Sequence, residues 1–120
     1  MYVAALVIAV LVSVGIIALG ARFVLAPRPA MVGFGVTPDR LRAMTSAKGV
    51  RDITSGVLLL VVWAAAGTTA LGWFMVAVAL TPVGDAVIVL TNGGKLATAL
   101  GVHGLTAALL LAGGLVLALG

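Results

Sequence analysis

The chain has 120 residues, of which 63% are hydrophobic and only 8% are charged. Soluble globular domains are roughly half apolar and about a quarter charged, so this composition excludes a soluble domain and predicts an integral membrane protein. At about 20 residues per helix, the chain can cross a bilayer four times with one modest loop left over. It has no cysteine, one histidine and three carboxylates, so we expect no disulfide, no metal site and no other cofactor.

Four apolar segments are expected to cross the membrane as helices. The first ends before Pro27, and the four cover about residues 2–24, 48–67, 70–91 and 96–118. Short turns at Gly67–Thr69 and Thr91–Lys95 make consecutive helices antiparallel neighbours. The predicted fold is therefore all-α, an integral membrane up-down-up-down four-helix bundle, with residues 1–120 forming a single transmembrane domain.

The positions of the basic residues predict the orientation in the membrane. All seven lysines and arginines lie on one side of the predicted bilayer, either in or flanking the loop 27–47 or at Lys95. By the positive-inside rule that side is cytoplasmic, and both termini lie on the outer side. Topology and anionic headgroups explain the basic balance, so we expect the lipid bilayer, and not nucleic acid, as the partner.

The basic loop contains a helix-start signal. Thr37, Pro38 and Asp39 provide an N-cap, a proline at the first helical position and an acid in the first turn. This pattern predicts a short interfacial helix that continues to about Ala47. The simpler interpretation is a basic loop that only sets the orientation.

Four polar residues lie inside the predicted spans at a common depth. Counting inward from the cytoplasmic edge at about 1.5 Å per residue puts all of them roughly 5–10 Å below the surface. They are Arg51, Asp52, Asp85 and His103. Charged groups at such a depth are costly unless they are paired, and intramembrane ionisable residues commonly mark functional sites.

Helical spacing adds hydroxyl side chains to the same faces. Ser55 follows Asp52 at three residues, and Thr81 precedes Asp85 at four. Thr106 lies near His103 on the fourth span. The predicted site therefore has candidate catalytic residues Asp52, Asp85 and His103, and candidate ligand-binding residues Arg51, Ser55, Thr81 and Thr106.

Several short motifs resemble a known family. They are Lys48-Gly49-Val50-Arg51-Asp52, Gly84-Asp85 and His103-Gly104, together with Phe34-Gly35 in the loop. This pattern of KG-x-RD, G-D and H-G is similar to that of small bacterial and fungal four-span membrane proteins classed as a domain of unknown function. The resemblance covers nearly the whole chain, implies the four-span architecture and a single polar site, and supplies no activity. We expect a multi-pass protein of the cell membrane, in bacteria the inner membrane.

Three classes of function remain open. The cluster could be a structural polar network that fixes helix register. It could be a binding or transport site in which protonation of Asp85 or Asp52 is exchanged against a lipophilic small molecule, and four short helices would then need a homodimer. The alternative is a membrane-embedded acid–base enzyme, an isomerase, cyclase or epoxide-opening enzyme acting on a lipid-soluble substrate. A pocket lined by these residues would favour the two functional classes.

Overall fold

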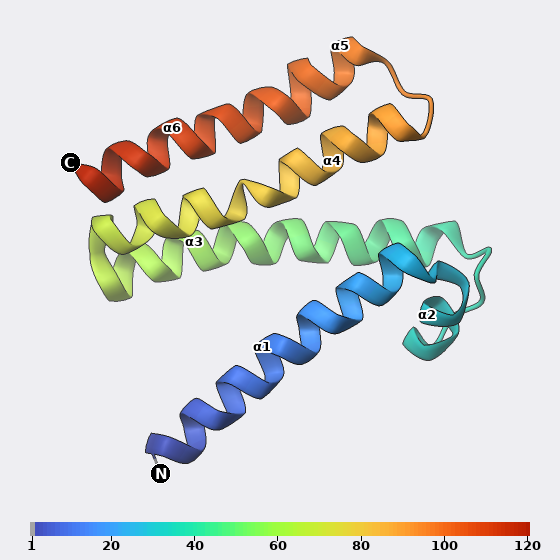
Figure 1. Cartoon of the computed structure of the whole chain (residues 1–120), viewed down its shortest axis with the longest axis horizontal. Helices are drawn as coiled ribbons and strands as arrows, with labels where there is room; N and C mark the ends of the chain where they lie inside the picture. The colour runs from blue at the N-terminus through green and yellow to red at the C-terminus, as the bar shows by residue number, and fades with distance from the viewer. Residues whose placement is uncertain (1) are drawn as a thin grey trace. The chain divides into compact units, whose positions relative to one another are not determined.

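The computed structural model describes residues 2–120, and over this range it contains helices and turns but no strand (Figure 1). The all-α class predicted from the sequence is therefore confirmed. The chain divides into two compact units, one ending at Gly49 and the other covering Val50–Gly120. The elements are α1 (Tyr2–Leu25), α2 (Pro27–Phe34), α3 (Leu41–Val78), α4 (Leu80–Thr91), α5 (Leu96–Thr98), the π-helical turn η1 (Ala99–Gly104) and α6 (Leu105–Leu119).

Large hydrophobic side chains cover the outside of the described helices. Leu60, Leu109 and Val116 are 65%, 63% and 70% exposed, whereas the hydrophobic residues buried in the second unit are alanines. A water-soluble protein has the opposite distribution. Two helical stretches, Leu41–Thr91 and Leu96–Leu119, are long and apolar enough to cross a membrane. The described surface therefore indicates membrane association.

In the first unit, α2 packs against the end of α1. Phe23 and Phe34 meet edge to face, with ring centroids 6.0 Å apart and planes at 80°. A Cβ atom placed on Gly33 would lie 3.5 Å from an Nη atom of Arg22. The expectation that Pro27 opens a loop is wrong, because proline at the start of a helix lacks only an N–H group that would have no helical partner there.

Gly35 ends α2 in a left-handed conformation, with φ of 110°. Its N–H donates to the carbonyl oxygen of Val32 at 3.1 Å, and the N–H of Val36 donates to that of Met31 at 3.1 Å. These two bonds form a Schellman motif, in which the residue after the glycine packs back on the last turn. Val36 is accordingly half-buried and Met31 is buried.

The helix predicted to start at Thr37 begins at Leu41 instead. The N–H of Arg40 donates to the carbonyl oxygen of Thr37 at 3.2 Å, which makes Pro38 the second residue of a β-turn, a position that proline favours. Helix α3 then continues without a break past Ala47. The predicted interfacial helix and the predicted second span are therefore one continuous helix, so residues 41–47 are not loop.

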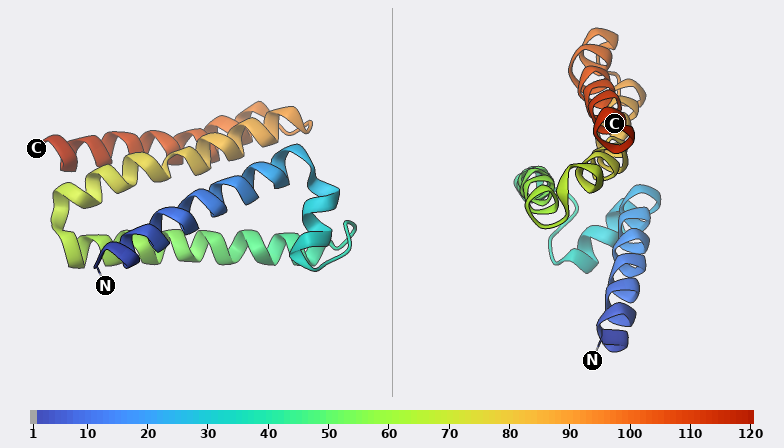
Figure 2. Two further views of the ribbon diagram at one scale, coloured as in Figure 1. Left: turned by 60° about the horizontal axis from the view of Figure 1, so that its bottom comes forward. Right: turned by 90° about the vertical axis from the view of Figure 1, so that its left-hand side faces the viewer.

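Gly67 interrupts α3 with φ of 88° and ψ of −177°, the one non-helical residue within it. L-amino acids avoid this region of backbone space, whereas glycine enters it without a Cβ clash. The chain reverses here in Figures 1 and 2. The predicted turn over residues 67–69 is thus a single residue, since Thr68 and Thr69 are already helical.

Pro82 separates α3 from α4. It cannot donate a hydrogen bond to the carbonyl of Val78, and its ring crowds that carbonyl, so the helix is broken at Ala79. The predicted third span, residues 70–91, is therefore two helical pieces. It ends as expected at Thr91. Just after this end, Gly93 has φ of 79°, and the N–H of Gly94 donates to the carbonyl oxygen of Val89 at 2.7 Å.

Helix α4 packs against η1 and α6 as an antiparallel pair, visible in both figures. The contact is lined by buried residues that we call the small-residue seam. These are Gly72 on α3, Ala79 between α3 and α4, Pro82 on α4, Ala99 on η1, and Ala107 and Gly114 on α6. Small residues allow membrane helices to approach closely, and dispersion forces between the backbones then stabilise the pair.

The π turn decides which side chain enters this seam. In a regular α-helix, at about 100° per residue, Leu100 would lie about 20° from the direction of Ala107 and Ala99 would lie about 80° away. Here the N–H of Leu105 donates to the carbonyl oxygen of Leu100, the i to i+5 bond of a π-helix, which adds a residue to the turn. Ala99 is consequently 0% exposed and Leu100 is 58% exposed.

Candidate functional site

Asp85 lies on the side of α4 that faces the neighbouring helix. It follows the buried Pro82 by three residues, so the two share a face, and it is half-buried. The break that Pro82 introduces lies at Ala79, at the start of α4. A carboxylate is thus positioned in the wall of an apolar helix, one turn beyond a kink.

His103 lies inside the π turn η1, against which α4 packs. It precedes the buried Ala107 by four residues. Like Asp85, it is half-buried. Single π turns are rare and are found frequently at functional sites, where they change the direction of a side chain.

Asp85 and His103 lie at similar distances along the chain from the turn that connects their helices. Asp85 lies six residues before the end of α4 at Thr91, and His103 lies seven residues after the start of α5 at Leu96. Since the two helices are antiparallel, similar distances from the connecting turn predict similar heights for the two residues. Helix α4, which carries Asp85, packs against η1, which carries His103, and a shared site for the two side chains stays a prediction.

The predicted residues of the second span lie on α3. Arg51 and Asp52 are exposed and Ser55 is half-buried. The contacts that unite α4 with η1 do not include this part of α3. A single site that contains all seven predicted residues stays a prediction.

The two threonines of the predicted site are both exposed. Thr81 is in the first turn of α4, next to Pro82. The hydroxyl of Thr106 donates to the carbonyl oxygen of Val102 at 2.7 Å, as hydroxyl groups in apolar helices commonly do. Because its proton is used in this way, Thr106 could contact a ligand only as an acceptor.

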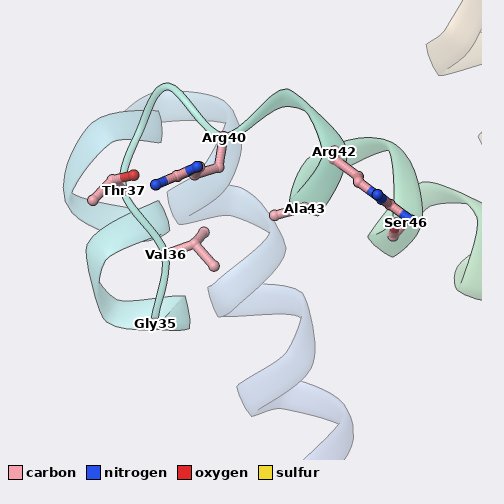
Figure 3. A pocket seen from close by; sticks show the side chains of 7 residues that line it. All are labelled: Gly35, Val36, Thr37, Arg40, Arg42, Ala43 and Ser46. Atoms are coloured by element: carbon pink, nitrogen blue, oxygen red, sulfur yellow. The ribbon is translucent and has the colours of Figure 1, made fainter.

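A pocket does occur in the described residues, but it is not at this cluster. It lies in the first unit, where the chain passes from α2 to α3 (Figure 3). It is lined by Gly35, Val36, Thr37, Arg40, Arg42, Ala43 and Ser46. None of the seven predicted site residues belongs to it, and its only signal in the sequence is the pair of arginines near the Thr37 turn.

The described residues form an all-helical protein with two apolar helical stretches long enough to cross a membrane. The family model for the domain of unknown function DUF4267 matches residues 13–117. The chain belongs to this family, in agreement with the resemblance inferred from its motifs. No match was found among curated proteins or solved structures. Since the family description carries no activity, function has to be argued from the site.

Proposed function

We propose that the chain is a four-span membrane protein of the cell membrane, one transmembrane domain with both termini outside, that binds or transports a lipophilic small molecule. The observation that supports this binding site is the packing of α4, which carries the half-buried Asp85, against η1, which carries the half-buried His103. Both helices depart from regular α geometry at this place, through Pro82 on one side and the π turn on the other.

The partial burial of the pair supports binding over a purely structural network. A network that only fixes register is fully enclosed and saturated with hydrogen bonds, because unsatisfied polar groups in lipid are costly. Asp85 and His103 are each half-buried, so a molecule dissolved in the bilayer could reach them between α4 and η1. A carboxylate at this depth can bind a lipophilic cation when ionised and release it when protonated.

The test measures binding of tetraphenylphosphonium, a lipophilic cation, to the full chain in detergent micelles. Asp85→Asn removes the charge while it keeps the side-chain shape, and we expect binding at least about tenfold weaker, corresponding to about 1.4 kcal/mol. Asp39→Asn is the matched control, because Asp39 is an exposed carboxylate in the turn before α3, and it should bind like the parent. Thermal unfolding followed by circular dichroism verifies that both variants fold.

Two results would contradict this function. The first is a parent chain that does not bind the cation, or an Asp85→Asn variant that binds it equally well. The second is an Asp85→Asn variant that no longer folds, together with a His103→Gln variant that folds and binds like the parent. That combination would identify Asp85 as a structural residue.

A further inference from the structure

The pocket in the first unit has a volume of about 510 Å³ and lies outside the predicted cluster. This size is within the range of roughly 300–1,000 Å³ that is typical of small-molecule sites. Four of its seven lining residues, Thr37, Arg40, Arg42 and Ser46, carry polar or cationic side chains, and none of the seven is acidic. The chemistry of the lining therefore selects an anion.

Each arginine lies on the same side of the pocket as a hydroxyl group. In Figure 3, Arg40 points toward Thr37 and Arg42 points toward Ser46. A guanidinium offers several N–H donors in a planar fork that matches the oxygen atoms of phosphate, and a hydroxyl can donate one more hydrogen bond. The two arginines point to opposite sides of the pocket in Figure 3, so either pair can donate hydrogen bonds to a phosphate group while the charge of the other arginine adds attraction.

The space between the two pairs is apolar. Val36 and Ala43 line it and both are half-buried, and the Schellman bonds at Gly35 fix the backbone that carries Val36. A pocket with cationic sides and an apolar middle suits an amphipathic molecule better than a bare ion. The first turn of α3, to which Ala43 belongs, adds the positive end of a helix dipole.

We propose that this pocket binds a phosphate group, either in the headgroup of a phospholipid or as free phosphate. The position in the chain suits a headgroup, because α2 packs on the end of the apolar helix α1 and the pocket follows directly after α2. Both arginines are exposed, so each contributes a modest, solvent-screened interaction, and the pair together determines the affinity.

The experiment uses isothermal titration calorimetry on the full chain in dodecyl maltoside, a detergent without phosphate. Three probes are compared: dihexanoylphosphatidylglycerol, inorganic phosphate, and dihexanoylglycerol, which lacks the phosphate. We expect Arg40→Gln and Arg42→Gln each to raise the Kd about fivefold, and the double variant to raise it more than about tenfold. Arg28→Gln is the matched control, since it removes the same charge from α2 outside the pocket, and its Kd should change less than about twofold.

The probes distinguish the two sources of phosphate. Tight binding of the phospholipid with weak binding of inorganic phosphate identifies a headgroup site, and comparable binding of both identifies a site for free phosphate. The proposal is overturned if neither phosphate probe binds, if dihexanoylglycerol binds as tightly as the phospholipid, or if Arg28→Gln weakens binding as much as the double variant. Circular dichroism verifies folding, and the single variants replace the double variant if the latter does not fold.

Discussion

Gly72 of α3 and Gly114 of α6 are in backbone contact. A Cβ atom placed on Gly114 would come within 2.7 Å of the carbonyl oxygen of Gly72, and one placed on Gly72 would meet the backbone of Ala118 and Gly114. The obstacle on each side is backbone, which cannot rotate away as a flexible side chain would. This contact fixes the closest approach of the two helices and makes the small-residue seam sensitive to single methyl groups.

The first prediction concerns this contact. Gly72→Ala should lower the free energy of unfolding by about 1–3 kcal/mol, because the added methyl group forces the helices apart. Unfolding by SDS in mixed micelles, followed by circular dichroism, measures the change. Gly56→Ala is the control in the same helix, since a Cβ there meets nothing within 4 Å, and it should be neutral or slightly stabilising. Equal effects of the two substitutions would show that the seam is not formed.

The second prediction tests the register set by the π turn. Ala99→Leu should destabilise the protein by about 1–3 kcal/mol, because Ala99 is fully buried and the larger side chain overpacks the seam. Leu100→Ala should change the free energy of unfolding by less than about 0.5 kcal/mol, because that side chain points outward. A regular α-helix would reverse this order, so the same SDS titration of the two variants decides between the two helix types.

The third prediction concerns Gly67. Gly67→Ala should cost about 1–3 kcal/mol, because its φ of 88° and ψ of −177° are unfavourable for any residue with a Cβ. Nothing lies within 4 Å of the added Cβ, so the cost comes from backbone conformation alone. Thr68→Ala changes the neighbouring exposed residue and should be nearly neutral. A harmless Gly67→Ala would mean that the chain reverses by another conformation.

The fourth prediction tests the proposed orientation, and it uses the absence of cysteine from the chain. Thr68→Cys should react with a membrane-impermeant maleimide added to intact cells, because its turn is placed outside. Asn92→Cys should react only after the membrane is permeabilised, because it lies on the side of the basic residues. The parent chain, which has no thiol, gives the background. Labelling of both cysteines in intact cells, or the opposite order, would contradict the topology.

The composition and the residues that end helices predicted much of the fold. The all-α class followed from the apolar runs, and the end of α4 at Thr91 followed from Asn92, Gly93 and Gly94. Pro27 was misread because proline disrupts a helix interior but is compatible with its first turn. Pro38 was expected at the first position of a helix, but it is the second residue of a β-turn, a position that proline also favours.

The candidate site was predictable only in part. The half-burial of Asp85 and His103 on packed elements is compatible with the common depth predicted for them, and their meeting in one site stays a prediction. The π turn had no sequence signal, since it depends on tertiary packing. It places the small residue Ala99 in the seam in place of Leu100. The pocket near Arg40 depends on how α2 folds back, and this could not be predicted while residues 27–34 were expected to be loop.

The small-residue seam also determines which substitutions the protein tolerates. Many large aliphatic side chains of the second unit, such as Leu60, Leu109 and Val116, are exposed, and there one can be exchanged for another with little effect on helix contacts. The seam residues have the reverse property, since a single added carbon atom meets backbone. Sequence drift in this protein should therefore be wide among leucine, valine and isoleucine on the outer faces and narrow at a handful of glycines and alanines.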